Sequence, residues 1–237
     1  MLLKKEFLYI LFFFSRSTRL KYLPHYLLGH FAELVLKKKT KKIRTNYLKY
    51  ITKKFLYTKN WFLSPLGVLD FYLKNKPKNI LEIGTYEGLL AIWLYKKFPK
   101  AKITIVDPFL SDDKNLSQED CQRFRIVEEN FNKNISNLDK KKILFFKITS
   151  DLFFIKNQNL FDIIYIDGNH TPEQCYKDIE NSYNVLSKNG LLIIDDIFLL
   201  DYKISPLDCL DVFLSKKNIK IKILSLNFQN IILQKIY

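Results

Sequence analysis

Short apolar runs alternate with amphipathic stretches along most of the chain. The runs predict strands over residues 79–83, 102–106, 143–148, 161–166, 191–194, 220–224 and 230–235. Helical periodicity between them predicts helices over 88–98, 117–133, 172–186 and 207–216. Nearly continuous apolar strands are typical of a parallel sheet covered by helices on both faces. The last two strands are separated only by residues 225–229, a gap too short for a crossover helix, so we expect them to form an antiparallel hairpin.

Residues 1–60 follow a purely helical pattern. Two groups of apolar residues recur at helical spacing, namely Leu27, Leu28, Phe31, Leu34 and Val35, and then Tyr47, Tyr50, Ile51 and Phe55. The lysine-rich run 37–42 between them predicts a loop or an exposed helix end. Ser64 and Pro65 predict the start of a further helix over 66–73. We therefore expect a helical extension over 1–60 and an α/β domain over 61–237.

Positive charge is concentrated in the extension. The chain carries a net charge of +15, of which residues 1–60 hold 15 Lys and Arg against Glu6 and Glu33, giving +13. The remaining 24 basic and 22 acidic residues give only +2. A basic segment favours contact with RNA, an anionic lipid surface or an acidic glycan. The alternative is that the lysines of a Lys-, Ile-, Asn- and Phe-rich chain only solvate helices.

Cysteine usage and hydropathy indicate the compartment. The three cysteines, Cys121, Cys175 and Cys209, form no C-x-x-C pair, so neither a zinc site nor a disulfide framework is indicated. No run approaches the roughly 20 apolar residues of a membrane-spanning helix. The apolar residues 7–14 are followed by 15–19 without a cleavage site, and they predict a helix that packs on the domain, on a partner or on a membrane surface. We expect a cytoplasmic protein, with peripheral membrane contact as the alternative.

A glycine turn follows the first predicted strand. The sequence ILEIGTYEG over 80–88 places Glu82, Gly84 and Gly88 between an apolar run and an amphipathic stretch. Strand, tight turn and helix in this order bring backbone N–H groups up to a nucleotide-like ligand. Tyr86 occupies the second glycine position of the dinucleotide fingerprint, where it hinders a pyrophosphate. The alternative is an ordinary strand-to-helix turn.

Two further strand ends carry polar groups suited to a nucleoside. Asp107 ends the second predicted strand, 23 residues after Gly84, near the spacing at which a carboxylate accepts from ribose hydroxyls. The alternative is a turn-capping aspartate before Pro108. Ser150 and Asp151 follow the third strand, where Asp151 is placed to accept from a purine amino group. In the alternative interpretation one of the two only caps the next helix.

Carboxylates and a histidine follow the fourth and fifth strands. Asp167 and His170 end the fourth strand, and Asp195 and Asp196 end the fifth. If these strands are neighbours, three carboxylates gather in a manner that suits Mg²⁺. Successive strand residues point to opposite faces, so Asp195 and Asp196 share a metal only if the strand has already ended. The alternative is that Asp196 caps the next segment.

His170 is the best candidate for a general base, because an imidazole titrates near neutral pH. The alternative is that it only packs against the turn. His25 and His30 lie in the basic extension, away from these carboxylates in the sequence.

These motifs together resemble the class I S-adenosylmethionine-dependent methyltransferases. The resemblance rests on LEIGTYEG at 81–88, IVDPF at 105–109, YIDGNH at 165–170, NGLLIIDD at 189–196 and the closing hairpin. It is greatest to the branch of macrocin-type sugar and small-molecule O-methyltransferases, which also contains members described as hydroxylases. It covers residues from about 61 to the C-terminus and leaves the first 60 residues unexplained.

The resemblance implies a Rossmann-like seven-stranded sheet in the order 3-2-1-4-5-7-6, with strand 7 antiparallel. It explains Tyr86, since S-adenosylmethionine has no pyrophosphate. Its implied cofactor residues are Glu82, Gly84 and Gly88 at the methionine end, Asp107 at the ribose, and Ser150 and Asp151 at the adenine. Its implied metal ligands are Asp167, Asp195 and Asp196, with Asp167 and His170 as catalytic residues.

Three functions remain open at this point. The first is metal-assisted O-methylation of a sugar or small-molecule hydroxyl. The second is an RNA methyltransferase that uses 1–60 as a basic arm, although no N-P-P-Y-like motif follows the fourth strand. The third is a non-catalytic protein that keeps the fold. We expect the acceptor pocket to come from 1–60, 108–120 and 197–207, and a homo-oligomer remains an expectation.

Overall fold

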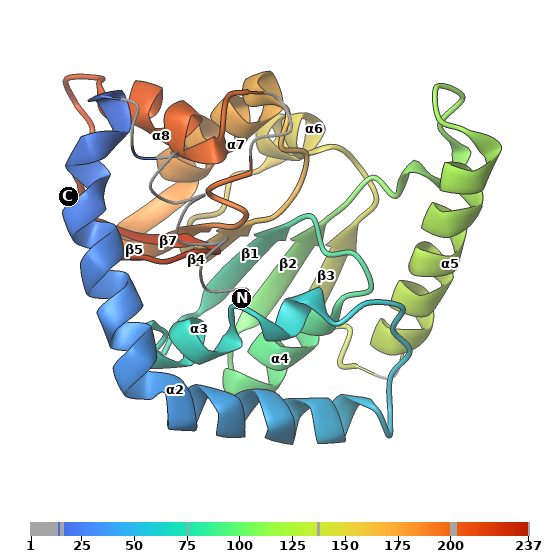
Figure 1. The fold of residues 1–237 in the computed structure, drawn as a ribbon. Coiled ribbons are helices and arrows are strands. Elements are labelled where there is room, and N and C mark those ends of the chain that lie inside the picture. Colours follow the sequence, from blue (N-terminus) through green and yellow to red (C-terminus); the bar gives the residue numbers. More distant parts are fainter. Residues whose placement is uncertain (1–13, 15–16, 75, 137, 200–202, 237) are drawn as a thin grey trace.

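A computed structural model describes residues 14, 17–74, 76–136, 138–199 and 203–236. It contains one seven-stranded sheet in the order β3-β2-β1-β4-β5-β7-β6 (Figure 1). The strands are β1 Asn79–Ile83, β2 Lys102–Val106, β3 Ile143–Phe146, β4 Phe161–Ile166, β5 Leu186–Ile194, β6 Ile221–Leu226 and β7 Ile231–Lys235. The first five strands pair in parallel, and β7 runs antiparallel to both β5 and β6. The predicted topology is therefore confirmed.

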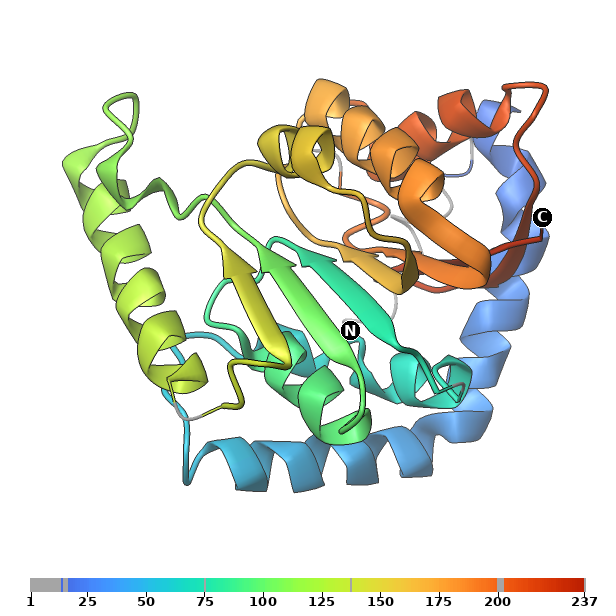
Figure 2. The same cartoon turned by 180° about the vertical axis from the view of Figure 1, so that it is seen from behind.

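Helices cover both faces of the sheet (Figures 1 and 2). They are η1 Ser17–Tyr22, α2 Leu23–Ile51, η2 Trp61–Leu63, α3 Leu66–Tyr72, α4 Leu89–Lys97, η3 Leu110–Asp112, α5 Gln118–Ile135, α6 Ser150–Lys156, α7 Pro172–Val185 and α8 Pro206–Leu214. One hydrophobic core joins the sheet to α2, α3, α4 and α5, and the other joins it to α6, α7 and α8. Strand β1 contributes to both cores: its neighbouring residues Ile80 and Leu81 are both fully buried and point into opposite cores. This two-sided burial explains the nearly continuous apolar runs.

The helical extension differs from its prediction at the lysine-rich run 37–42. The prediction of a loop or helix end there is wrong, since α2 continues from Leu23 to Ile51 and the run lies in its middle. Lysine is a good helix former, and 37–42 contains neither glycine nor proline, so nothing in the run stops the helix. The helix bends between an N-terminal half beside the outer edge of the sheet and a C-terminal half beneath α3 and α4 (Figure 1).

The C-terminal half of α2 contributes to the core. Tyr47 and Ile51 are buried there, and the Tyr47 hydroxyl donates to the carbonyl of Leu89 at 2.6 Å, at the start of α4. The extension therefore supports the helix that follows the glycine turn.

The predicted apolar segment 7–14 lies outside the described residues except for Phe14. That side chain is buried, and its ring centroid lies 5.7 Å from Phe198 and 5.6 Å from Tyr26. Within the described parts of the chain, no helix is long and apolar enough to cross a membrane.

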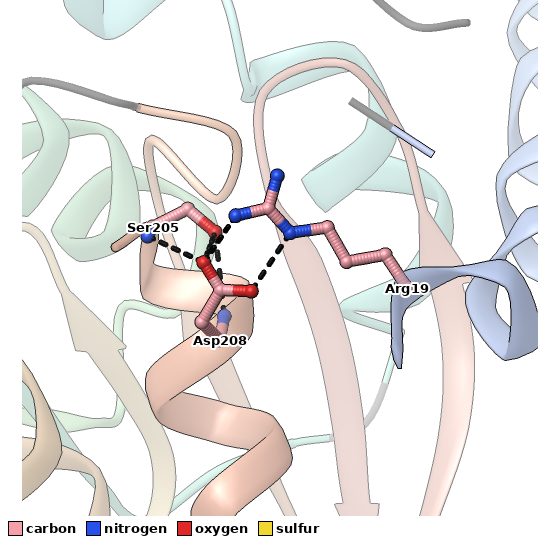
Figure 3. Close-up of polar contacts among 3 residues, drawn as sticks. All are labelled: Arg19, Ser205 and Asp208. Atoms are coloured by element: carbon pink, nitrogen blue, oxygen red, sulfur yellow. Dashed lines mark hydrogen bonds and ion pairs between the residues drawn. The ribbon is translucent and has the colours of Figure 1, made fainter. Parts of the chain in front are cut away.

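An ion pair fastens η1 to the start of α8 (Figure 3). Arg19 is 2% exposed, and its Nε donates to Oδ1 of Asp208 at 2.7 Å while Nη2 bonds Oδ2. Asp208 also accepts from the backbone N–H of Ser205 at 2.7 Å in a capping box. Burial opposes the charge of Asp208, but the hydrogen bonds from Arg19 and Ser205 outweigh it and lower the pKa of this carboxyl.

The Arg19→Met variant should lose roughly 3 kcal/mol of unfolding free energy at pH 7, because it leaves a half-buried carboxylate without its partner. A carboxyl with a lowered folded pKa stabilises the protein above its unfolded pKa of about 3.9 and loses this effect as the pH falls. The difference between wild type and variant should therefore shrink below about pH 4. Urea titrations from pH 7 to pH 3 measure it, and a difference independent of pH would contradict the pairing.

Candidate active site

The turn after β1 depends on two glycines with positive φ. Gly84 has φ +76°, and a Cβ there would lie 2.0 Å from the carbonyl oxygen of Asp167. Gly88 has φ +77° and is the N-cap of α4. Because β1 and β4 are paired neighbours, the chain leaves β1 directly against the segment that follows β4. The glycine turn and Asp167 are thus in direct contact at the carboxyl ends of β1 and β4.

Two buried glutamates hold this turn in place. Glu82 is 1% exposed and accepts from the Thr85 hydroxyl at 2.9 Å. Burial raises its pKa, and the charges of Asp167 and Asp107 act in the same direction. Glu87 accepts from the Thr58 N–H at 2.8 Å, so the segment that leaves the extension is tied to the turn.

Asp107 lies at the end of β2, as predicted. Its Oδ2 accepts from the Thr85 N–H and its Oδ1 from the Phe109 N–H, both at 2.9 Å. Burial raises its pKa. These bonds match the turn-capping alternative, and Asp107 also lines the first of two cavities. Its contact with a ribose stays a prediction.

The first cavity, of about 560 Å³, lies at the carboxyl ends of β1, β2 and β4. Its wall includes Gly84, Asp107, Pro108, Ser150, Asp167, Gln174 and Asp178. Ser150 lines it, but neither Ser150 nor Asp151 caps α6, because Thr149 is the N-cap and accepts from the Leu152 N–H at 3.4 Å. The capping alternative for these two residues is therefore wrong.

Two residues of α7 complete this wall and were not predicted. The Gln174 side-chain amide donates to Ser150 at 3.1 Å and to Asp151 at 3.0 Å. Asp151 is therefore hydrogen-bonded to a residue of the cavity wall but is not itself part of that wall. Asp178 is 1% exposed, and burial raises its pKa to about 6. Gln174 and Asp178 are four residues apart in the predicted helix, so they share one helical face; only the tertiary structure shows that this face meets the cavity.

A second cavity, of about 740 Å³, adjoins the first. The two share Gly84, Thr85, Tyr86, Asp167, Gly168 and His170. The second is also lined by Arg44 of α2, by residues 59–65 and by the two aspartates after β5. Trp61 is 64% exposed at this wall, and its ring centroid lies 5.6 Å from Tyr86. The two cavities are therefore adjacent at the six residues that they share, among them Asp167.

Acidic side chains and His170 meet where the two cavities join. Strands β4 and β5 are parallel neighbours, and β5 ends at Ile194, so Asp195 and Asp196 lie beyond the strand as the metal hypothesis requires. His170 Nε2 lies 3.5 Å from Asp167 Oδ1 and 3.7 Å from Asp196 Oδ2. Donor atoms of Asp167, His170 and Asp196 all lie within 4.8 Å of one another.

Asp195 lies behind this group rather than within it. It is 6% exposed, and its Oδ2 accepts from the Tyr165 hydroxyl at 2.5 Å. Its buried Oδ1 meets no donor at hydrogen-bonding geometry among the described residues. Burial raises the pKa of Asp195, and the nearby charge of Asp167 adds to the effect. The two carboxylates of Asp167 and Asp196 and the imidazole of His170, whose donor atoms lie within 4.8 Å of one another, fit a divalent cation.

Comparison with known families identifies the central part of the chain. Residues 81–197, which run from β1 past the two aspartates, match the family model of a methyltransferase domain. This match and the strand order of the sheet support a class I methyltransferase domain in this part of the chain. The segment that matches contains every predicted site residue from Glu82 to Asp196.

Relatives of the methyltransferase domain agree with this assignment. The chain is 25% identical over 129 residues to the O-methyltransferase hkm8 of Aspergillus hancockii, covering 54% of this chain and 46% of that protein. The chain thus spans less than half the length of this relative.

Two solved structures share the fold. The S-adenosylhomocysteine-bound methyltransferase PaMTH1 of Podospora anserina has a TM-score of 0.54 and 15% identity, covering 81% of this chain and 87% of that one. The O-methyltransferase TomG of Streptomyces achromogenes, in complex with S-adenosylmethionine, has a TM-score of 0.50 and 10% identity, covering 90% and 98%.

Proposed function

We propose that the chain is an S-adenosylmethionine-dependent O-methyltransferase that acts, with a divalent cation, on a hydroxyl of a small molecule or sugar. One observation carries the proposal. A cavity built on the glycine turn and Asp107 opens, at Asp167, into a second cavity that contains His170 and the aspartates after β5. Methyl transfer needs this arrangement, because donor and acceptor must meet in line at one point.

The first cavity would hold the methyl donor. Gly84 lines this cavity at the turn proposed for the methionine end, and Glu82 and Gly88 support that turn from outside the cavity wall. Asp107 lines the cavity on the side proposed for the ribose. Ser150 lines the side proposed for the adenine, and Asp151 acts there through Gln174. S-adenosylmethionine supplies the methyl group as a sulfonium and leaves as a neutral thioether.

The second cavity would hold the acceptor. The exposed ring of Trp61, next to Tyr86, offers a flat apolar wall for a sugar or aromatic ring. His170 faces the junction and takes the proton that the hydroxyl loses as its oxygen bonds to the methyl carbon. The carboxylates of Asp167 and Asp196, 3.5 and 3.7 Å from Nε2, stabilise the imidazolium that results.

Asp167 and Asp196 are the proposed metal ligands, because their donor atoms lie within 4.8 Å of one another and of His170. Asp195, also predicted as a ligand, lies behind them and accepts from the Tyr165 hydroxyl. A divalent cation held by Asp167 and Asp196 lowers the pKa of the acceptor hydroxyl and fixes its orientation.

Chelation tests the metal. Protein treated with EDTA should transfer methyl groups from radiolabelled S-adenosylmethionine to a panel of catechols and sugars at least tenfold more slowly, and Mg²⁺ or Mn²⁺ should restore the rate. Binding of S-adenosylhomocysteine should persist, because most of the wall of its cavity, including Gly84, Asp107 and Ser150, takes no part in the proposed metal site. Full activity in EDTA would remove the metal from the proposal and leave the cofactor site intact.

A further inference from the structure

The N-terminal half of α2 carries an apolar patch that nothing in the proposed reaction uses. We call it the α2 patch; it consists of Leu27, Leu28, Phe31, Leu34 and Val35, which are 58, 69, 66, 56 and 67% exposed. Their spacing places all five on one side of the helix. Large exposed apolar side chains gathered in this way mark interaction surfaces.

The buried opposite side of the helix shows which way the α2 patch faces. Gly29 is buried, and a Cβ there would lie 2.0 Å from the carbonyl oxygen of Leu226 in β6. This contact leaves no space for a side chain, so this half of α2 lies directly on the outer strand of the sheet. The α2 patch therefore faces away from the domain. The helix that carries it lies beside the sheet edge (Figures 1 and 2).

Positive charge without matching carboxylates follows the patch along the same helix. The lysine group consists of the exposed Lys37, Lys38, Lys41 and Lys42. Within the described residues none of the four has an ion-pair partner closer than 4.0 Å.

The acidic residues that contact the extension are already paired. Asp70 binds Lys39 at 3.4 Å and Lys97 at 2.6 Å, and Asp211 pairs with Lys21. Glu33 is the one acidic residue of α2, and it is half-buried near Arg44 rather than exposed among the lysines. The lysine group is therefore available to an external anion.

We propose that the α2 patch and the lysine group dock the protein on an anionic lipid bilayer. The apolar side chains would enter the boundary between headgroups and acyl chains, and the lysines would meet the lipid phosphates. The helix lies in the plane of the membrane surface and does not span it. This inference is independent of the proposed methyl transfer.

Charge favours a bilayer over the two other occupants. Symmetric pairing of the patch with a second copy joins two basic helices whose exposed sides bring no carboxylate to the interface. RNA phosphates would bind the lysines, but they would make no favourable contact with the five exposed apolar side chains. An anionic bilayer offers acyl chains to the α2 patch and phosphates to the lysine group.

Cosedimentation of the full chain with vesicles tests the proposal. The protein should bind vesicles of phosphatidylcholine with 30% phosphatidylglycerol at least about 30-fold more tightly than phosphatidylcholine alone, since each lysine near an anionic surface contributes about fivefold. The triple variant Leu27→Gln, Phe31→Gln, Val35→Gln and the triple variant Lys38→Gln, Lys41→Gln, Lys42→Gln should each lose at least tenfold in binding. All six residues are exposed, so the thermal midpoints should not move.

Control variants remove side chains of the same kinds from other surfaces. Ile155→Gln with Leu160→Gln removes exposed apolar side chains, and Lys133→Gln with Lys140→Gln and Lys141→Gln removes three exposed lysines. Both should bind vesicles as wild type does. Equal binding to neutral and anionic vesicles, or none to either, overturns the proposal.

The competing occupants give different results. A dimer in light scattering that the apolar variant abolishes, without vesicle binding, assigns the surface to a second copy. Tight binding of single-stranded RNA that only the lysine variant weakens, without vesicle binding, assigns it to nucleic acid. Either result overturns the membrane proposal.

Discussion

Replacing Asp196 with asparagine should lower methyl transfer at least 100-fold while binding of S-adenosylhomocysteine changes by less than threefold. Asp196 lines the second cavity, and its Oδ2 lies 3.7 Å from His170 Nε2. Asparagine removes the negative charge that would hold a cation and stabilise the protonated histidine. The donor cavity does not include Asp196 in its wall, so cofactor binding should persist. Initial rates with the best acceptor of the panel and calorimetry with S-adenosylhomocysteine measure both effects.

Asparagine is the informative substitution at this position. Asp196 has φ +46°, a left-handed conformation that asparagine tolerates and alanine does not, so the variant should keep the backbone. Glu173→Gln is a matched control, because it removes one negative charge from the exposed start of α7. The control should retain wild-type rates. An Asp196→Asn protein with more than half of the wild-type activity would contradict the assigned role.

Gly84→Ala should cost at least about 3 kcal/mol of unfolding free energy and abolish binding of the cofactor product. The left-handed φ of +76° alone costs an L-residue about 1–2 kcal/mol. The new Cβ would also lie 2.0 Å from the oxygen and 2.5 Å from the carbonyl carbon of Asp167. These are backbone atoms, so relief of the clash separates the end of β1 from the end of β4. Urea unfolding followed by circular dichroism measures the loss.

Gly168→Ala is the control for Gly84→Ala. A Cβ at Gly168 would lie 3.4 Å from a methyl carbon of Ile83 as its nearest neighbour, which is ordinary contact, and its φ is not positive. This variant should lose less than about 1 kcal/mol. Similar stability of the two variants would show that the turn at Gly84 is not constrained by the β4 segment.

Much of the fold follows from local pattern. The apolar runs of β1 and β4 and the short gap between β6 and β7 determine the sheet, because two-sided burial and hairpin length leave few arrangements. The lysine run shows where local pattern fails: dense positive charge does not end α2, because lysine has a high helix propensity. β5 begins at Leu186, earlier than predicted, because Asn189 and Gly190 have the sequence of a turn although they lie within the strand.

The candidate site was predictable where it follows strand ends. The carboxyl ends of parallel strands meet at one edge of the sheet, and this places Asp107, Asp167 and Asp196 together. The burial of Asp195 beneath Tyr165 depends on tertiary packing, and so does the position of Asp178 behind the first cavity. Trp61 carries no motif and reaches the second cavity only because the extension folds back over the turn.

Titration of S-adenosylhomocysteine into the full chain by isothermal calorimetry tests the central claim most directly. We predict saturable binding of one molecule per chain, with wild type and Asp196→Asn nearly equal. Folded protein that shows no binding heat at high micromolar ligand, and no thermal stabilisation by the same ligand, would contradict the assignment of the first cavity to the methyl donor.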